Sequence, residues 1–179
     1  MGVFDESKCD CCVCPMQCVL EQLIGREDIN LYNTNNITNM ITITGVKEFI
    51  VSTSAGDFPI HQIILVQLTN SIDQPITITL KPLKKNVREC ACCEDPMANL
   101  ANSMKGDIVF VEYLNNFGPF QEEILKVGEG IVMGRFPGDP RFTDIFSTCA
   151  ITRIINQQQS SAGTSSSRHF NINTSPPTT

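Results

Sequence analysis

The chain has 179 residues, a formal net charge of −6 and a hydrophobic fraction of 41%. That much apolar sequence can fill one ordinary core or two small ones, which excludes global disorder. The acidic balance argues against a surface that follows phosphates, because nucleic-acid binding needs clustered lysine and arginine. The N-terminus lacks the basic and apolar regions of a secretory leader, and no segment approaches the roughly 20 apolar residues that span a bilayer. We therefore expect synthesis in a cytoplasm and no membrane partner.

An internal repeat organises the nine cysteines of the chain. The run that starts at Cys9, Cys-Asp-Cys-Cys-Val-Cys-Pro-Met, aligns without gaps on the run that starts at Cys90, Cys-Ala-Cys-Cys-Glu-Asp-Pro-Met. The match extends through Gly25 on Gly106. Such a repeat predicts two copies of one structural unit.

A short helix is predicted after each cysteine cluster. Apolar residues recur at helical spacing and form one face in each copy: Met16, Val19, Leu20, Leu23 and Ile24, then Met97, Leu100, Ala101 and Met104. Pro15 and Pro96 suit the first helical position, and Asp95 is a suitable N-cap. Gly25 and Gly106 stand where a left-handed C-terminal cap would end each helix.

Five short strands are predicted after each helix, separated by turns rich in asparagine, glycine and proline. They cover residues 28–32, 39–44, 48–53, 57–61 and 63–68 in the first copy, and 108–114, 120–127, 130–136, 142–147 and 149–155 in the second. An alternating run over 76–80 predicts one further strand between the copies, and the lysines after it would keep that edge soluble. The final residues are polar and of low complexity, which predicts a mobile tail.

These patterns divide the chain into five parts. We expect a cysteine-rich arm over 1–14, a first small barrel over 15–68, a linker with the extra strand and second cysteine cluster over 69–95, a second barrel over 96–155, and a disordered polar tail over 156–179.

A helix followed by five short, bent strands, with almost no loop before the fifth, resembles the Sm-like (SH3-type) small barrel. The segments Leu-Ile-Gly, Ile-Thr-Gly-Val-Lys-Glu-Phe-Ile-Val and Ile-Ile-Leu-Val-Gln-Leu are similar to those of small Sm-like proteins of spore-forming bacilli. The resemblance implies an all-β fold of two tandem small barrels, each preceded by a short helix.

Three kinds of chemistry compete for the cysteines. Zinc is one: Cys11, Cys14, Cys90 and Cys93 could supply four thiolates, since each pair has the two-residue gap that suits one tetrahedral ion. Redox catalysis is another, but it requires a βαβ setting and a lowered thiol pKa, and neither is indicated.

Intermolecular disulfide formation is the third possibility and the one we favour. Adjacent cysteines point in different directions in an extended chain and can reach two neighbours. The expected cross-linking residues are Cys9, Cys11, Cys12, Cys14, Cys90, Cys92 and Cys93. Cys18 and Cys149 lie in a predicted helix and strand, and we interpret them as small buried hydrophobes.

Cytoplasmic synthesis combined with thiol-rich arms is typical of spore-surface proteins. The chain, with its opening Cys-Asp-Cys-Cys-Val-Cys-Pro-Met-Gln-Cys, resembles uncharacterised cysteine-rich coat or exosporium proteins of the Bacillus group. The resemblance implies a structural protein made in the mother-cell cytoplasm and deposited on the spore surface. Its partners would be other copies of itself and other spore-surface proteins.

An enzyme is not expected. His61 and His169 have no nucleophile near them in sequence, and the carboxylates Glu122, Glu123 and Asp139 are interpreted as solvated. No cofactor is expected if disulfides form. The alternative is a zinc-stabilised Sm-like module that binds RNA or protein, for which a cluster formed by Lys84, Lys85 and Arg88 is the only basic candidate.

Overall fold

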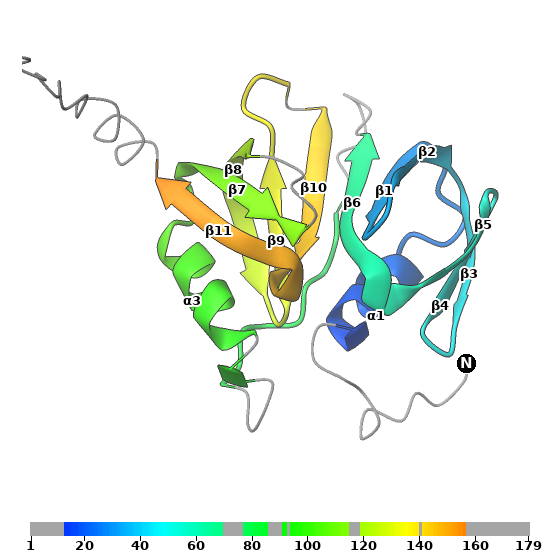
Figure 1. Cartoon of the computed structure of the whole chain (residues 1–179), viewed down its shortest axis with the longest axis horizontal. Helices are drawn as coiled ribbons and strands as arrows, with labels where there is room; N and C mark the ends of the chain where they lie inside the picture. Colours follow the sequence, from blue (N-terminus) through cyan, green and yellow to red (C-terminus); the bar gives the residue numbers. More distant parts are fainter. Residues whose placement is uncertain are drawn as a thin grey trace, which may run out of the picture.

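The computed structural model describes residues 13–69, 77–85, 91–92, 94–114, 119–139 and 141–156. The polar tail and five of the predicted cross-linking cysteines lie outside these residues: Cys9, Cys11, Cys12, Cys90 and Cys93. The described chain is mainly β, with two α-helices and two antiparallel sheets, which confirms the predicted class (Figure 1).

The first half contains one helix, six strands and a 3₁₀ turn: α1 (Val13–Glu21), β1 (Ile29–Asn33), β2 (Ile37–Ile41), β3 (Ile43–Lys47), β4 (Ile50–Thr53), β5 (Gly56–Pro59), η2 (Ile60–Gln62) and β6 (Ile63–Thr69). The predicted strand over 39–44 divides at Thr42, because β2 pairs with β1 while β3 pairs with β4. The strand predicted from Glu48 starts later, since Glu48 and Phe49 both have positive φ (51° and 63°) in the two-residue turn of the β3–β4 hairpin.

The second half repeats the plan with five strands: α3 (Asp95–Ser103), β7 (Ile108–Tyr113), β8 (Phe120–Gly128), β9 (Ile131–Arg135), β10 (Phe142–Ser147), η4 (Thr148–Ala150) and β11 (Ile151–Asn156). These bounds lie close to the predicted ones. The main difference is at 149–155, where the strand starts later because η4 occupies its first residues. The helix α3 begins at Asp95, so that Glu94 rather than Asp95 holds the N-cap position.

The two halves share backbone hydrogen bonds as well as element order. The amide of Gly25 donates to the carbonyl of Ile43 at 2.7 Å, and the amide of Gly106 donates to that of Ile124 at 2.8 Å. In both halves the strand residue donates back to the carbonyl that follows the glycine. Both glycines have positive φ, 82° and 88°. They are not the predicted C-terminal caps, because α1 ends at Glu21, α3 has its C-cap at Met104, and each glycine amide bonds to a strand carbonyl instead of its own helix. The repeat is therefore structural.

The expectation of two closed barrels needs correction. The larger sheet has the order β11-β7-β8-β9-β10-β6-β1-β2, and the smaller one is β3-β4-β5. Strand β10 of the second half pairs with β6 of the first, from Phe142 opposite Thr69 to Phe146 opposite Leu65. This pairing, which we call the internal joint, satisfies two strand edges that separate domains would leave open, and it places β6, β1 and β2 of the first half in one sheet with the strands of the second.

Each helix covers its own half. Met16, Val19, Leu20 and Leu23 of the first helical segment are buried in one core cluster, which also includes Ile78 of the linker. A second cluster surrounds Phe146 and includes Ala101 of α3. The predicted apolar faces are too wide, because Ile24 and Leu100 are 51% and 38% exposed. Neither described helix has the length and apolarity needed to span a membrane.

The linker contains no strand over its described residues 77–85, contrary to the prediction for 76–80. The side chain of Gln22 takes the place of a partner strand: its Oε1 accepts from the amide of Thr79 at 2.9 Å and its Nε2 donates to the Thr79 carbonyl at 3.0 Å. The alternating pattern therefore reflects the burial of Ile78. Lys84 does not protect an open edge; its Nζ lies 2.7 Å from Oε1 of Glu129.

Candidate functional site

Segments that carry cysteines meet at one turn of the second half. Gly130, between β8 and β9, has a positive φ of 63°. A Cβ added there would lie 2.7 Å from Cγ of Pro15 and 3.1 Å from Oε1 of Glu94. The carbonyl of Gly130 also accepts a hydrogen bond from the amide of Thr148 at 2.9 Å. The first turn of α1, the residue before α3 and η4 therefore converge on this glycine, which we call the Gly130 pole.

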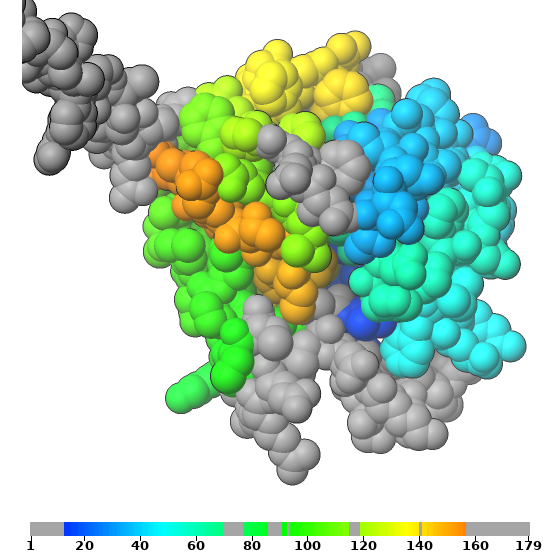
Figure 2. Space-filling view, in the orientation of Figure 1, coloured from blue at the N-terminus to red at the C-terminus, as the bar shows by residue number. Residues whose placement is uncertain are grey.

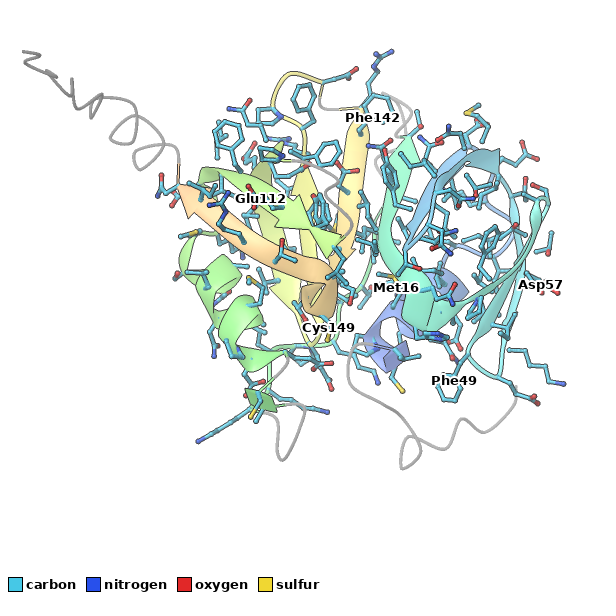
Figure 3. All side chains as sticks on the ribbon, viewed as in Figure 1. Met16, Phe49, Asp57, Glu112, Phe142 and Cys149 are labelled. Carbon is cyan, nitrogen blue, oxygen red and sulfur yellow. The ribbon has the colours of Figure 1, made fainter. Side chains whose placement is uncertain are left out.

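The described cysteines at this pole differ in chemical state. Cys14, next to Pro15, and Cys149, next to Thr148, are both disulfide-bonded. Cys149 is exposed in η4, so its interpretation as a buried hydrophobe is wrong (Figure 3). Cys92, two residues before Glu94, is an exposed free thiol. Cys18 is half-buried on α1.

The predicted zinc ligands cannot be compared as a set. Three of them, Cys11, Cys90 and Cys93, lie outside the described residues, so the zinc alternative stays a prediction. Within the part of the chain that the structure describes, no group of three or more His, Cys, Asp or Glu side chains could hold a metal ion. His61 is exposed in η2, and Glu94, which contacts the pole, is buried at 2% exposure.

A pair of buried carboxyl groups forms a second unusual feature, and it was missed in the sequence. Glu122 on β8 and Asp144 on β10 are only 1% and 4% exposed. Their strands are separated by β9, where Gly134 stands opposite Asp144. A Cβ on Gly134 would lie 2.9 Å from Oε2 of Glu122, so the missing side chain leaves room for this carboxyl group. Oε2 of Glu122 and Oδ1 of Asp144 have no hydrogen-bond partner among the described residues, and an interaction between the two carboxyl groups contributes to the raised pKa of Glu122. The interpretation of Glu122 as solvated is therefore wrong.

Amide side chains extend this pair across the internal joint. Gln67 on β6 stands opposite Asp144 and hydrogen-bonds to it. The Nδ2 of Asn30 on β1 donates to Oε1 of Gln67 at 2.9 Å. The Oδ1 of Asn30 accepts in turn from the backbone amide of Met40 at 3.1 Å. We call this series, from Met40 through Asn30 and Gln67 to the carboxyl pair, the polar relay.

Burial and mutual repulsion determine the protonation of the pair. Desolvation, followed by the charge of Asp144 and the hydrogen bond to it, raises the pKa of Glu122 to about 10. Desolvation also raises the pKa of Asp144, while hydrogen bonds from Glu122 and Gln67 oppose that shift. Both pKa values are therefore raised, and at neutral pH the pair holds a proton that two exposed carboxyl groups would have released. A pair this deeply buried has no access for a substrate, so it is not an active site.

Two phenols lie close to the carboxyl pair. Burial raises the pKa of Tyr113 well above its usual value, and the charges of Glu122 and Asp144 raise it further. Burial and the same two carboxyl groups raise the pKa of Tyr32. Tyr113 packs on the ring of Phe146, with 5.1 Å between ring centroids. Its hydroxyl has no hydrogen-bond partner among the described residues.

Two sequence signals could have indicated the buried pair. Glu122 lies two residues before Ile124 in β8, on the face that alternation assigns to the core. Asp144 lies in a strand that is almost wholly buried, directly before Ile145 and Phe146. A charged residue at such a position needs a partner, but its identity depends on the strand order.

Comparison with known proteins returns no relative: no family model, no curated protein and no solved structure matches the chain.

Proposed function

We propose that this protein is a self-assembling structural protein of a bacterial spore surface, whose copies pair edge to edge and are locked together by intermolecular disulfides. The observation that carries the proposal is the internal joint. It pairs two copies of one repeated unit, and the complementary edges of that unit, β11 in the larger sheet and β5 in the smaller one, are each paired on one side only within the described chain. A second copy of the chain would fit those ends.

The strand order supports this reasoning. In each half the fifth strand lies beside the first, and the second, third and fourth follow in order, if the bent β2 and β3 count as one strand. The internal joint pairs the fifth strand of the first half, β6, with the fourth strand of the second, β10. The fourth strand of the first half, β5, and the fifth strand of the second half, β11, are each paired on one side only within the described chain. This order, with a 3₁₀ turn before each fifth strand, also supports our proposal that each half is related to the Sm-like small barrels.

The positions of the two edges favour a chain or ring of copies. Strands β11 and β5 lie on opposite sides of the molecule (Figure 1). Residues of β11 reach the surface (Figure 2). Asp57 of β5 and Glu112, whose carboxylate binds Arg153 of β11, mark these two sides in Figure 3. One copy can therefore present β11 to the β5 of the next without blocking its own β5.

Thiol chemistry would make such contacts permanent. Cys92 supplies an exposed thiol close to the Gly130 pole, whereas Cys14 and Cys149 are already bonded within the chain and would not reach a neighbour. The opening cysteine motif and its likeness to coat and exosporium proteins support the location and other spore-surface proteins as partners. Strand pairing would determine the geometry, and disulfides would prevent dissociation.

The proposal predicts non-covalent assembly of the full chain under reducing conditions. Sedimentation velocity over increasing concentration should show species heavier than the 19.8 kDa monomer. If β5 of one copy pairs with β11 of the next in the same register as β10 with β6, Phe58 lies opposite Arg153. Cysteines at these two positions would then be within the reach of a disulfide. Phe58→Cys protein mixed with Arg153→Cys protein should become linked through these positions upon oxidation. The control mixture replaces Arg153→Cys with Glu112→Cys, one strand inside the edge.

Non-reducing electrophoresis tests the covalent part. The oxidised wild-type chain should run as multimers that collapse upon reduction, and Cys92→Ser should decrease them while the reduced assembly is retained. A protein that stays monomeric at every concentration in reducing buffer would contradict edge pairing. An oxidised protein that runs as a monomer without reductant would contradict cross-linking.

A further inference from the structure

The polar relay crosses the internal joint at its centre. Asp144 and Gln67 form the middle pair of the β10–β6 ladder, which has two further residue pairs on each side. On the β8 side the relay ends at Glu122, and on the β1 side it continues through Asn30. On one side of it Ile145 stands opposite Val66, both 0% exposed, and on the other Thr143 stands opposite Leu68. The halves thus meet through a line of polar side chains that runs from the buried carboxyl pair to the half-buried Gln67 and Asn30.

The donors in the relay have one direction. The side-chain amide of Asn30 donates to the Gln67 oxygen, and the NH₂ group of Gln67 is then left to donate to Asp144. Asp144 thus already accepts a hydrogen bond from the Gln67 amide. The Gln67 side chain cannot turn away from Asp144 without also breaking the bond that its Oε1 accepts from Asn30. A hydrogen bond from Glu122 to Asp144 requires a proton on one of the two carboxyl groups. Without that proton, two carboxylates would be in contact in a site nearly free of water.

The described groups that act on the pair do not supply a compensating positive charge. Strand β7 contributes the phenol of Tyr113, β1 that of Tyr32, β6 the amide of Gln67, and β9 only Gly134. The neighbouring Glu123 is engaged with Arg135, whose Nη2 lies 2.8 Å from its Oε2. The repulsion that follows from losing the proton must therefore be relieved by opening the structure.

We propose that a single proton shared by Glu122 and Asp144 holds the internal joint closed, so that the joint loosens as the solution becomes alkaline. The sign follows from linkage. A carboxyl group whose pKa is raised by folding holds a proton that the unfolded chain releases. Its stabilising contribution is complete below the ordinary pKa near 4.5 and is lost as the pH rises toward about 10. The joint is thus strongest in mild acid.

Thermal unfolding of the full chain between pH 5 and 9, with reductant present, tests the proposal. The wild-type melting temperature should fall by at least about 5 °C over this range because the proton becomes harder to hold. Glu122→Gln keeps a neutral donor of the same shape, so its melting temperature should change less with pH and exceed that of the wild type at pH 9. Glu123→Gln is the matched control: it alters the neighbouring carboxylate, and its profile should follow the wild type.

Hydrogen exchange locates the effect. Corrected for intrinsic rates, the amides of β6 and β10 in the wild type should lose protection at pH 9 before those of β3–β5, and Glu122→Gln should remove that difference. An equal pH dependence in wild type and Glu122→Gln would overturn the proposal. So would a rise in the wild-type melting temperature upon adding calcium or magnesium, absent in Glu122→Gln, since a cation rather than a proton would then hold the pair. Neither result depends on whether copies assemble.

Discussion

The two halves have the same order of elements but differ in the residues at matching positions of their second and fourth strands. In the second half, Glu122 and Asp144 meet behind Gly134. The shared hydrogen-bond pattern makes Ile41 the counterpart of Glu122, and counting back from the 3₁₀ turns makes Gly56 the counterpart of Asp144. The first half is therefore apolar where the second half is acidic. The half that keeps its fourth strand inside the molecule carries the buried carboxyl pair, and the half whose fourth strand is an outer edge has Ile41 and Gly56 at the matching positions.

A matched pair of phenylalanines should give the largest difference between the halves. Phe146 is fully buried and packs on Tyr113, whereas its counterpart Phe58 is only partly buried at the outer edge. Phe146→Ala should cost about 3–5 kcal/mol of unfolding free energy, because it removes a large core side chain beside the joint. Phe58→Ala should cost less than half of that. Urea denaturation measures both, and equal losses would show that the outer edge is as well packed as the joint.

Glycines in the two halves should differ by a smaller amount. Gly134→Ala brings a Cβ to 2.9 Å from Oε2 of Glu122 and 3.3 Å from the Glu123 carbonyl, so we expect a loss of about 1–3 kcal/mol. Gly45→Ala in β3 meets no atom within 4 Å and should be neutral or stabilising by up to about 1 kcal/mol. Chemical denaturation of both variants compares them. A neutral Gly134→Ala would mean that the carboxyl pair does not need the space.

The smallest effect is expected at the β1–β2 turn of the first half. The Oδ1 of Asn33 accepts from the amides of Asn35 and Asn36 at 2.8 and 2.9 Å, and Asn33 is 6% exposed. Asn33→Ala should cost about 1–2 kcal/mol, since it leaves these donors without their acceptor. Asn35→Ala, which retains the backbone donor, is the control. If both variants unfold alike, the side chain of Asn33 does not hold this turn.

Much of the fold could be predicted because its signals are local. The helical spacing from Met16 to Leu23 identified α1, and the positive φ that the sequence assigned to Gly25 and Gly106 is present, although both lie beyond the helix ends. Period-two patterns located most strands within a few residues. The positive φ of Phe49 could not be anticipated, because a large aromatic residue rarely occupies a hairpin turn. The linker pattern around Ile78 was misleading because the burial of Ile78 between exposed neighbours gives the same alternation as a strand.

The candidate site was harder to predict from the sequence. The cysteine motifs indicated thiol chemistry, but only the tertiary structure brings Pro15, Glu94 and Thr148 to the Gly130 pole. The proximity of Glu122 to Asp144 depends on β9 lying between their strands with a glycine at the crossing point. No pattern within either strand encodes that arrangement.

Local patterns in the sequence were enough to predict the β class, the two helices and the duplication, because hydrophobic periodicity acts over a few positions. Long-range packing determines that β10 pairs with β6, that β5 and β11 are each paired on one side only in the described chain, and that Glu122 is buried. These features depend on which strand edges find partners. That choice is a competition between distant segments for backbone hydrogen bonds and apolar contact, and it is resolved only when the whole chain packs.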